Sequence, residues 1–98
     1  MTIPMTFTGH HVEVTPALKQ YAQEKFARLE KRGDHITHFN ITFSVEKLRQ
    51  IAKAVLHVKG AEIHASEEAG DMYAAIDGLV DKLKRQIERH RDGHTDHH

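Results

Sequence analysis

The chain has 98 residues, no cysteine, and fourteen basic against fourteen acidic side chains, so its formal net charge is zero with histidine neutral. A chain of this length forms one domain with a modest core, and the absence of cysteine excludes disulfides, thiolate metal sites and a cysteine nucleophile. No apolar run approaches the roughly 18 residues of a membrane span, and the N-terminus lacks the pattern of a secretory signal, so we expect a cytoplasmic protein.

Charge is unevenly distributed along the chain although the total is zero. Residues 16–32 carry five basic and two acidic side chains, residues 82–91 carry five and one, and residues 62–71 carry four acidic side chains and no basic one. Zero net charge gives no general attraction for nucleic acid. Binding of that kind would therefore have to come from the two basic segments.

The N-terminal part predicts a strand followed by a helix. Apolar and polar residues alternate from Ile3 to Phe7, which is typical of a strand with one buried face. Thr15 and Pro16 form a helix start signal, an N-cap residue followed by proline at the first helical position. The helix should end near Gly33, because glycine readily adopts the left-handed conformation of a helix C-cap.

Period-two alternation marks three further strands in the middle of the chain. From Ile36 to Glu46, phenylalanine, isoleucine and valine alternate with polar residues, and the same pattern resumes from Ala52 to Lys59 and at residues 61–65. Each strand therefore has one apolar face.

The connection between the last two strands predicts their pairing. Gly60 and Ala61 are typical of a two-residue hairpin turn with glycine first. This turn would place His57 opposite His64 on the polar face of the sheet.

The C-terminal segment 71–91, DMYAAIDGLVDKLKRQIERHR, predicts a long amphipathic helix. Its apolar stripe consists of Met72, Ile76, Leu79, Val80, Leu83 and Ile87. Lys82, Arg85 and Arg89 point away from that stripe. Gly78 also lies on the outward face, and glycine within a helix costs about 1 kcal/mol relative to alanine. The N-terminal half of that face therefore presents little side-chain bulk and leaves room for a close approach to the backbone; the simpler account is that the glycine is merely tolerated there.

The element order is β-α-β-β-β-α, which places the chain in the α+β class. The crossover helix makes the first strand parallel to its neighbour, and hairpins make the others antiparallel, giving a four-stranded mixed sheet. Because each strand has one apolar face, both helices should pack on the same face, as in a double-stranded-RNA-binding domain. A single domain is expected over residues 1–91. Residues 92–98, which contain no apolar side chain, should form a disordered tail.

The two helices carry basic residues at the same spacing. These are Lys25, Arg28 and Arg32 on the first helix and Lys82, Arg85 and Arg89 on the last. If the helices are neighbours, the two sets should merge into one positive surface that contacts RNA phosphates, separated from the acidic Glu67 and Glu68. The simpler alternative is that both sets are solvated helix faces.

Ten histidines raise the question of a metal site. The sharpest arrangement pairs His57 with His64 on the open sheet face, joined by Glu62 or His38. Two exposed histidines without a fixed third ligand are a weak signal, and no catalytic motif accompanies them. We therefore expect no enzyme, no metal and no cofactor. The alternatives are a metal-dependent enzyme using His57 and His64, and an adaptor that binds a protein through the open sheet face.

Three stretches resemble bacterial hibernation promoting factors and their sibling ribosome-associated inhibitors, in the sigma-54 modulation protein family. The segment 71–91 resembles the family's closing helix. TGHHVEVTPALKQYAQEKFARLEK, at residues 8–31, resembles its first turn and helix, and LHVKGAEIHASEEAGDMYAAID, at residues 56–77, resembles its hairpin and helix entry. The similarity covers nearly all of residues 5–91.

The resemblance implies a factor that binds the small ribosomal subunit and its 16S ribosomal RNA near the decoding centre. It would block the path of messenger RNA and of transfer RNA in the A and P sites, so that translation stops. By position, the family's basic contact residues fall on Lys25, Arg28, Lys82, Arg85 and Arg89.

The length of the chain resembles the short form of the family, without the C-terminal dimerising domain of the long forms. The short form acts with ribosome modulation factor in pairing inactive ribosomes, and we expect a monomer off the ribosome. The alternative within the family is the inhibitor that does not promote such dimers.

Overall fold

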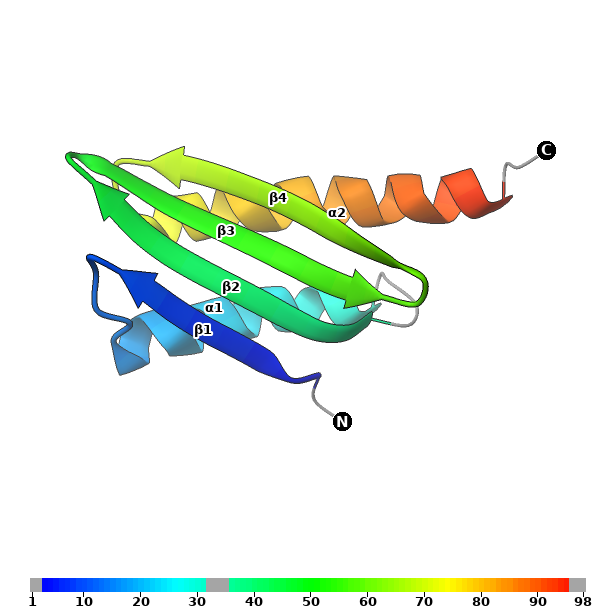
Figure 1. Ribbon diagram of the computed structural model, residues 1–98, viewed down its shortest axis with the longest axis horizontal. Helices are drawn as coiled ribbons and strands as arrows, with labels where there is room; N and C mark the ends of the chain where they lie inside the picture. Colours follow the sequence, from blue (N-terminus) through cyan, green and yellow to red (C-terminus); the bar gives the residue numbers. More distant parts are fainter. Residues whose placement is uncertain (1–2, 32–35, 96–98) are drawn as a thin grey trace.

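A computed structural model describes residues 3–31 and 36–95 and has the predicted element order (Figure 1). The elements are β1 (Met5–His10), α1 (Pro16–Ala27), the 3-10 helix η1 (Arg28–Lys31), β2 (Ile36–Glu46), β3 (Arg49–Val58), β4 (Ala61–Ala69) and α2 (Met72–Thr95). The predicted β-α-β-β-β-α fold is confirmed.

The four strands form one mixed sheet in the order β1-β2-β3-β4. Strand β1 runs parallel to β2, whereas the β2–β3 and β3–β4 pairs are antiparallel. Both helices lie on one face of the sheet, as the single apolar face of each strand predicts, and the other face is open (Figure 1).

The core lies between the sheet and the helix layer. Its largest fully buried side chains are Phe26, Leu29, Phe39, Ile41, Phe43, Leu56, Ile76, Leu79 and Leu83. The Phe26 ring of α1 packs on the Phe39 ring of β2, with centroids 5.8 Å apart. Among the described residues no polar or charged side chain is buried, so burial of apolar surface is what positions both helices.

Helix α1 begins as its sequence predicts. The Thr15 hydroxyl accepts a hydrogen bond from the backbone N–H of Leu18 at 3.1 Å, and Pro16 occupies the first turn. The α-helical segment ends at Ala27 and tightens into the 3-10 helix η1, a common ending for an α-helix. The predicted stop at Gly33 lies outside the described residues.

Helix α2 is longer than predicted. The Asp71 carboxylate accepts a hydrogen bond from the Ala74 backbone N–H at 3.0 Å and caps the first turn. The helix then continues to Thr95, beyond its predicted end at Arg91, while residues 96–98 lie outside the described part. Extending an existing helix adds one backbone hydrogen bond per residue and needs no buried side chain.

The β3–β4 hairpin has a different register from the predicted one. His57 lies opposite Glu62 rather than opposite His64, which means that the predicted pairing is wrong by two residues. The turn consists of Lys59 and Gly60, and Gly60 is in the second position with φ 81°, a left-handed conformation that suits glycine. A shift of two residues keeps every side chain on its face, so the predicted core is unaffected.

Candidate nucleic-acid interface

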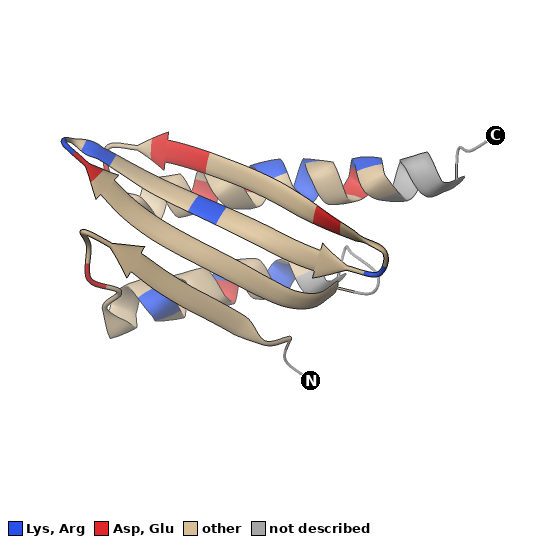
Figure 2. Ribbon diagram, in the orientation of Figure 1, with Lys and Arg blue, Asp and Glu red and all other residues tan. Residues whose placement is uncertain are grey.

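Helix α2 has two exposed flanks, because its apolar stripe packs into the core. One flank faces α1 across a groove. The other faces the β4 edge of the sheet, where Lys82, Gln86 and Arg89 border two shallow hollows beside the strand. Basic residues recur along the C-terminal half of the helix (Figure 2).

The inter-helix groove has a volume of about 340 Å³ and brings cations and carboxylates together. It is lined by Lys25, Arg28, Leu29, Asp77, Val80, Asp81 and Lys84. Lys25 Nζ lies 3.5 Å from Asp77 Oδ1. The two carboxylates therefore offset part of the positive charge that the sequence predicts for this surface.

Asp77 also orders two tyrosines beside the groove. The Tyr21 hydroxyl donates a hydrogen bond to Asp77 Oδ1 at 2.7 Å, and the Tyr21 ring meets the Tyr73 ring edge to face, with centroids 4.9 Å apart. The hydrogen bond to the carboxylate is the main cause that raises the pKa of Tyr21, and burial raises this pKa further. The ammonium of Lys25 lies 5.3 Å from the centre of the Tyr21 ring.

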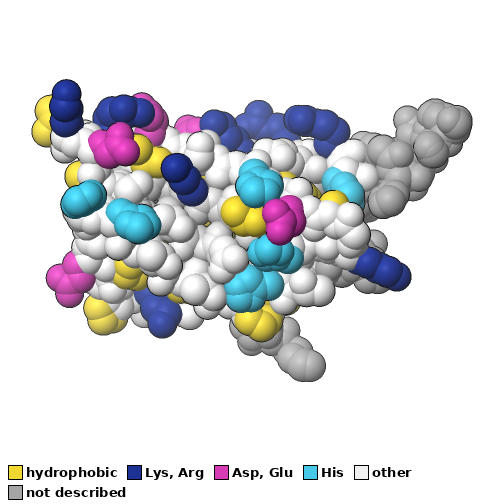
Figure 3. Space-filling view, in the orientation of Figure 1, with side chains coloured by type: hydrophobic (Ala, Val, Ile, Leu, Met, Phe, Trp, Pro, Cys, Tyr) yellow, Lys and Arg dark blue, Asp and Glu magenta, His cyan; other side chains and the backbone are white. Residues whose placement is uncertain are grey.

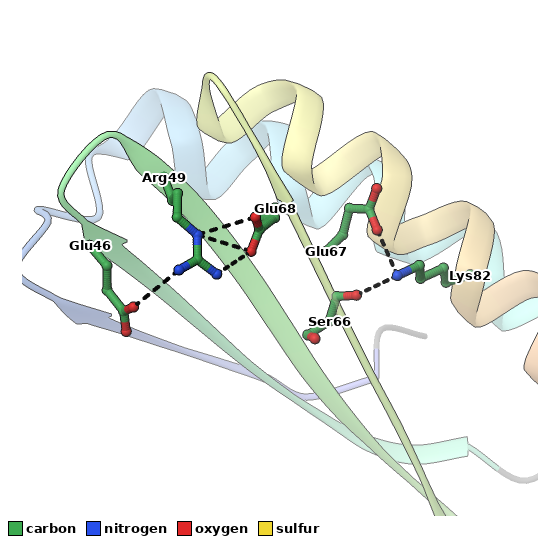
Figure 4. A network of polar contacts seen from close by, with 6 residues as sticks. All are labelled: Glu46, Arg49, Ser66, Glu67, Glu68 and Lys82. Atoms are coloured by element: carbon green, nitrogen blue, oxygen red, sulfur yellow. Dashed lines mark hydrogen bonds and ion pairs between the residues drawn. The ribbon is translucent and has the colours of Figure 1, made fainter.

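On the other flank, side chains of α2 bind the edge strand β4. Lys82 Nζ lies 2.7 Å from Glu67 Oε1 and donates to the backbone carbonyl of Ser66 at 2.9 Å (Figure 4). One turn later, Gln86 Nε2 donates to the backbone carbonyl of His64 at 3.0 Å. These bonds satisfy carbonyls along a sheet edge that has no neighbouring strand.

The predicted merging of the two basic sets into one surface is therefore wrong. Lys82 lies against β4, whereas Lys84 faces the groove with Lys25 and Arg28. A helix turns by about 100° per residue, so side chains two residues apart point in nearly opposite directions. The acidic segment is not separate either, because Glu67 binds Lys82 directly.

The predicted open surface at Gly78 is occupied by Glu67. A Cβ atom at Gly78 would lie 2.7 Å from Glu67 Cγ and 2.9 Å from Glu67 Oε2. The molecule that approaches the α2 backbone closely here is thus the protein itself. Glycine at this position leaves room for a side chain of β4.

The remaining predicted contact residues are displayed to solvent. Arg28, Arg85 and Arg89 are exposed, and Arg85 Nε is 3.4 Å from the backbone carbonyl of Asp81 one turn earlier. Arg32 lies outside the described residues. An exposed guanidinium offers several N–H donors in a planar fork that matches a phosphate group.

The open face of the sheet carries histidines rather than a row of cations (Figure 3). Glu62 lies between the two imidazoles predicted to pair: Oε2 is 3.3 Å from His57 Nδ1, and Oε1 is 3.1 Å from His64 Nε2. On its other side, His57 Nε2 is 3.3 Å from Asn40 Nδ2. Within the part of the chain that the structure describes, no group of three ligating side chains could hold a metal ion.

A second polar cluster closes the end of the open face. Arg49 binds Glu68 through Nε and Nη2, with Nε 3.1 Å from Oε2, and its Nη1 lies 3.9 Å from Glu46 (Figure 4). The hydrogen bonds from Arg49 lower the pKa of Glu68. The basic side chain here is thus engaged by carboxylates of the neighbouring strands.

Residues 5–95 match the family model described as "Sigma 54 modulation protein / S30EA ribosomal protein". The chain is 54% identical over 88 residues to the ribosome hibernation promoting factor of Klebsiella oxytoca and 50% identical to that of Escherichia coli K12. Each match covers 90% of this chain and 93% of the relative. No helix among residues 3–31 and 36–95 is long and apolar enough to cross a membrane.

Two solved structures share the fold. A ribosomal subunit interface protein from Coxiella burnetii superposes with a TM-score of 0.87, and the N-terminal domain of Thermus thermophilus Protein Y with 0.81. Both are 31% identical to this chain, and each match covers 91% of this chain and 98% of the other. The likeness therefore extends over most of the chain.

Proposed function

The chain belongs to the family of sigma 54 modulation and S30EA ribosomal proteins, and we propose that it binds the small ribosomal subunit through the exposed cations of its helix layer. The family consists of ribosome-associated hibernation factors and not of enzymes. The single domain predicted for residues 1–91 would carry out this binding in the cytoplasm. The domain would bind 16S ribosomal RNA near the decoding centre.

The observation that carries this proposal is the display of arginines on the helix layer. Arg85 and Arg89 project from α2, and Arg28 projects beside the inter-helix groove. Each guanidinium can bind a phosphate through two N–H groups, whereas Lys25 and Lys82 act as point charges. Arg32, which lies outside the described residues, completes the proposed set.

The proposed mechanism is occlusion and involves no chemical step. A domain bound at the decoding centre occupies the path of messenger RNA and of transfer RNA in the A and P sites. Because the attraction comes from phosphate contacts, binding releases condensed counterions and weakens as salt rises. The ribosome is then stored and not consumed.

We further propose that the bound protein favours inactive ribosome dimers, with ribosome modulation factor as a second partner. Support comes from the relatives, which are named ribosome hibernation promoting factors. Sucrose-gradient profiles of ribosomes, with the protein and the modulation factor added separately and together, would measure this. If the protein inhibits translation but leaves the dimer fraction unchanged or lower, it acts as an inhibitor of the non-pairing kind.

The central experiment is cosedimentation with purified small subunits over a range of salt concentrations. For about five phosphate contacts, the slope of log K against log salt should be about −3.5 to −4.5. Arg85→Ala should flatten this slope by about one unit, while thermal stability stays nearly unchanged because the side chain is exposed.

Lys59→Ala is the matched control, since Lys59 is an exposed cation on the β3–β4 turn. It should leave both affinity and slope at their wild-type values. If the two variants bind alike, the basic helix surface is only solvated and the proposal is wrong.

A further inference from the structure

Lys82 differs from Arg85 and Arg89 in that its ammonium group is held by residues of the neighbouring strand β4. Glu67 Oε1 lies 2.7 Å from Nζ, and the Ser66 carbonyl accepts a hydrogen bond from Nζ at 2.9 Å (Figure 4). An ammonium has three N–H donors, so two are engaged and one is left for solvent or a ligand. The Lys82 side chain remains 47% exposed.

The position of Glu67 depends on the glycine beneath it. The Glu67 side chain is only 32% exposed, and its Cγ lies 2.7 Å from where a Cβ of residue 78 would be. This is closer than two non-bonded carbon atoms approach in proteins, so any larger residue at Gly78 has to push the glutamate aside. Strand β4 and helix α2 thus pack closely because residue 78 has no side chain and leaves room for Glu67.

A lysine in this setting contributes less to phosphate binding than a free lysine does. Its charge is already balanced by a carboxylate at 2.7 Å. A phosphate that approached Lys82 would also approach Glu67, and two like charges in contact repel each other. Fewer condensed counterions would therefore be released at this position than at Arg85 or Arg89.

We infer that Glu67 restrains RNA binding by holding Lys82 against β4, so that Lys82 contributes less to RNA binding than Arg85 and Arg89 do. The inference rests on the function proposed above and adds a specificity-determining residue to it. Weakening one cation lowers the attraction that every RNA shares. Binding then depends more on a surface that engages several arginines at once.

The test is Glu67→Gln, which keeps the shape of the side chain and removes its charge. Binding is measured at several salt concentrations to two probes, purified small ribosomal subunits and poly(U) RNA. For both probes the slope of log K against log salt should steepen by about 0.7 to 0.9, the value of one additional phosphate contact. The gain in affinity should then be about threefold larger at ~50 mM than at ~200 mM salt.

Two further variants separate this effect from a change in total charge. Glu68→Gln removes the same charge from the neighbouring residue, whose partner is Arg49 on the open face, and should leave the slope unchanged. Gly78→Ala changes no charge at all, but its Cβ displaces Glu67. It should steepen the slope as Glu67→Gln does.

The outcomes decide the inference separately from the proposed function. Equal slopes for Glu67→Gln and Glu68→Gln, or a wild-type slope for Gly78→Ala, would overturn the restraint by Glu67. If the wild-type protein binds poly(U) but not small subunits, the proposed function fails, and the poly(U) slopes still decide the inference. Failure of every variant to bind either probe would overturn both.

Discussion

The two faces of the sheet are built from alternate residues of the same strands, yet they have different roles. On β2, Phe39 and Ile41 are buried against the helices, while Asn40 between them belongs to the polar network of the open face. One face supplies stability through apolar burial. The other carries polar side chains, several of which bind one another across the strands.

Charges also differ between the two sides of the molecule. On the open face, Arg49 is bound by Glu46 and Glu68 of the adjacent strands. On the helix layer, Arg85 and Arg89 extend into solvent. A sheet surface holds its side chains in fixed cross-strand pairs, whereas the outward side of a helix leaves them available. This difference supports our proposal that the helix layer binds RNA.

The largest expected difference between the faces is in folding stability. Leu83 is fully buried between α2 and the sheet, so Leu83→Ala should lower the free energy of unfolding by about 2 to 5 kcal/mol. Lys53→Ala, in the middle of the open face, should change it by at most about 0.5 kcal/mol. Urea unfolding curves of both variants measure the difference. Similar midpoints would mean that the two faces are wrongly distinguished.

A smaller effect is expected where the helix layer meets solvent. The pKa of Tyr21 lies above its ordinary value of 10.0, chiefly because its hydroxyl donates to Asp77. Asp77→Asn should lower this pKa. Because this pKa is raised in the folded state, the hydrogen bond stabilises the fold fully below pH 10, and the stabilisation is lost as pH rises through the pKa of the folded state. The Asp77→Asn variant should lack this stabilisation.

The measurement is an alkaline absorbance titration of tyrosinate. A Tyr73→Phe background keeps the edge-to-face ring contact and leaves Tyr21 as the only tyrosine. An unchanged midpoint after Asp77→Asn would show that the carboxylate does not set the pKa of Tyr21.

The smallest effect is expected on the open face. Arg49 holds the pKa of Glu68 below its ordinary value of 4.5, so Arg49→Gln should raise that pKa. Because the pKa of Glu68 is lowered in the folded state, the ion pair stabilises the fold at pH values above 4.5. This stabilisation is lost as pH falls through the folded-state pKa. Carboxyl carbon NMR shifts during an acid titration give the pKa. No rise would mean that solvent screens the pair completely.

Much of the fold follows from local patterns in the sequence. The period-two segments become strands, the amphipathic segment becomes α2, and Thr15 and Asp71 cap the helices that follow them. The single apolar face of each strand is enough to place both helices on one side. The resemblance to a family predicts a ribosome-binding protein, which a composition with zero net charge does not indicate.

The candidate site was predicted less completely than the fold. Spacing along each helix indicates the six basic positions, but it does not reveal which flank of α2 faces α1. Lys84 does not belong to those six, although it lines the inter-helix groove with Lys25. The signal for Glu67 was present in Gly78, since a glycine within a helix implies a close neighbour, but the sequence does not say which one.

The sequence by itself determined the elements, their order and the side of each that is buried, because these depend on residues close together along the chain. Only the tertiary structure decided the contacts between elements: Glu62 opposite His57, Glu67 over Gly78, and Lys82 bound to the edge of β4. Hydrophobic patterning specifies which face of an element is buried. It does not specify the register of a strand against its neighbour or the rotation of a helix about its axis. The position and the rotation are fixed when the side chains of two packed elements fit together. Here a glutamate of β4 fills the space that a glycine of α2 leaves free.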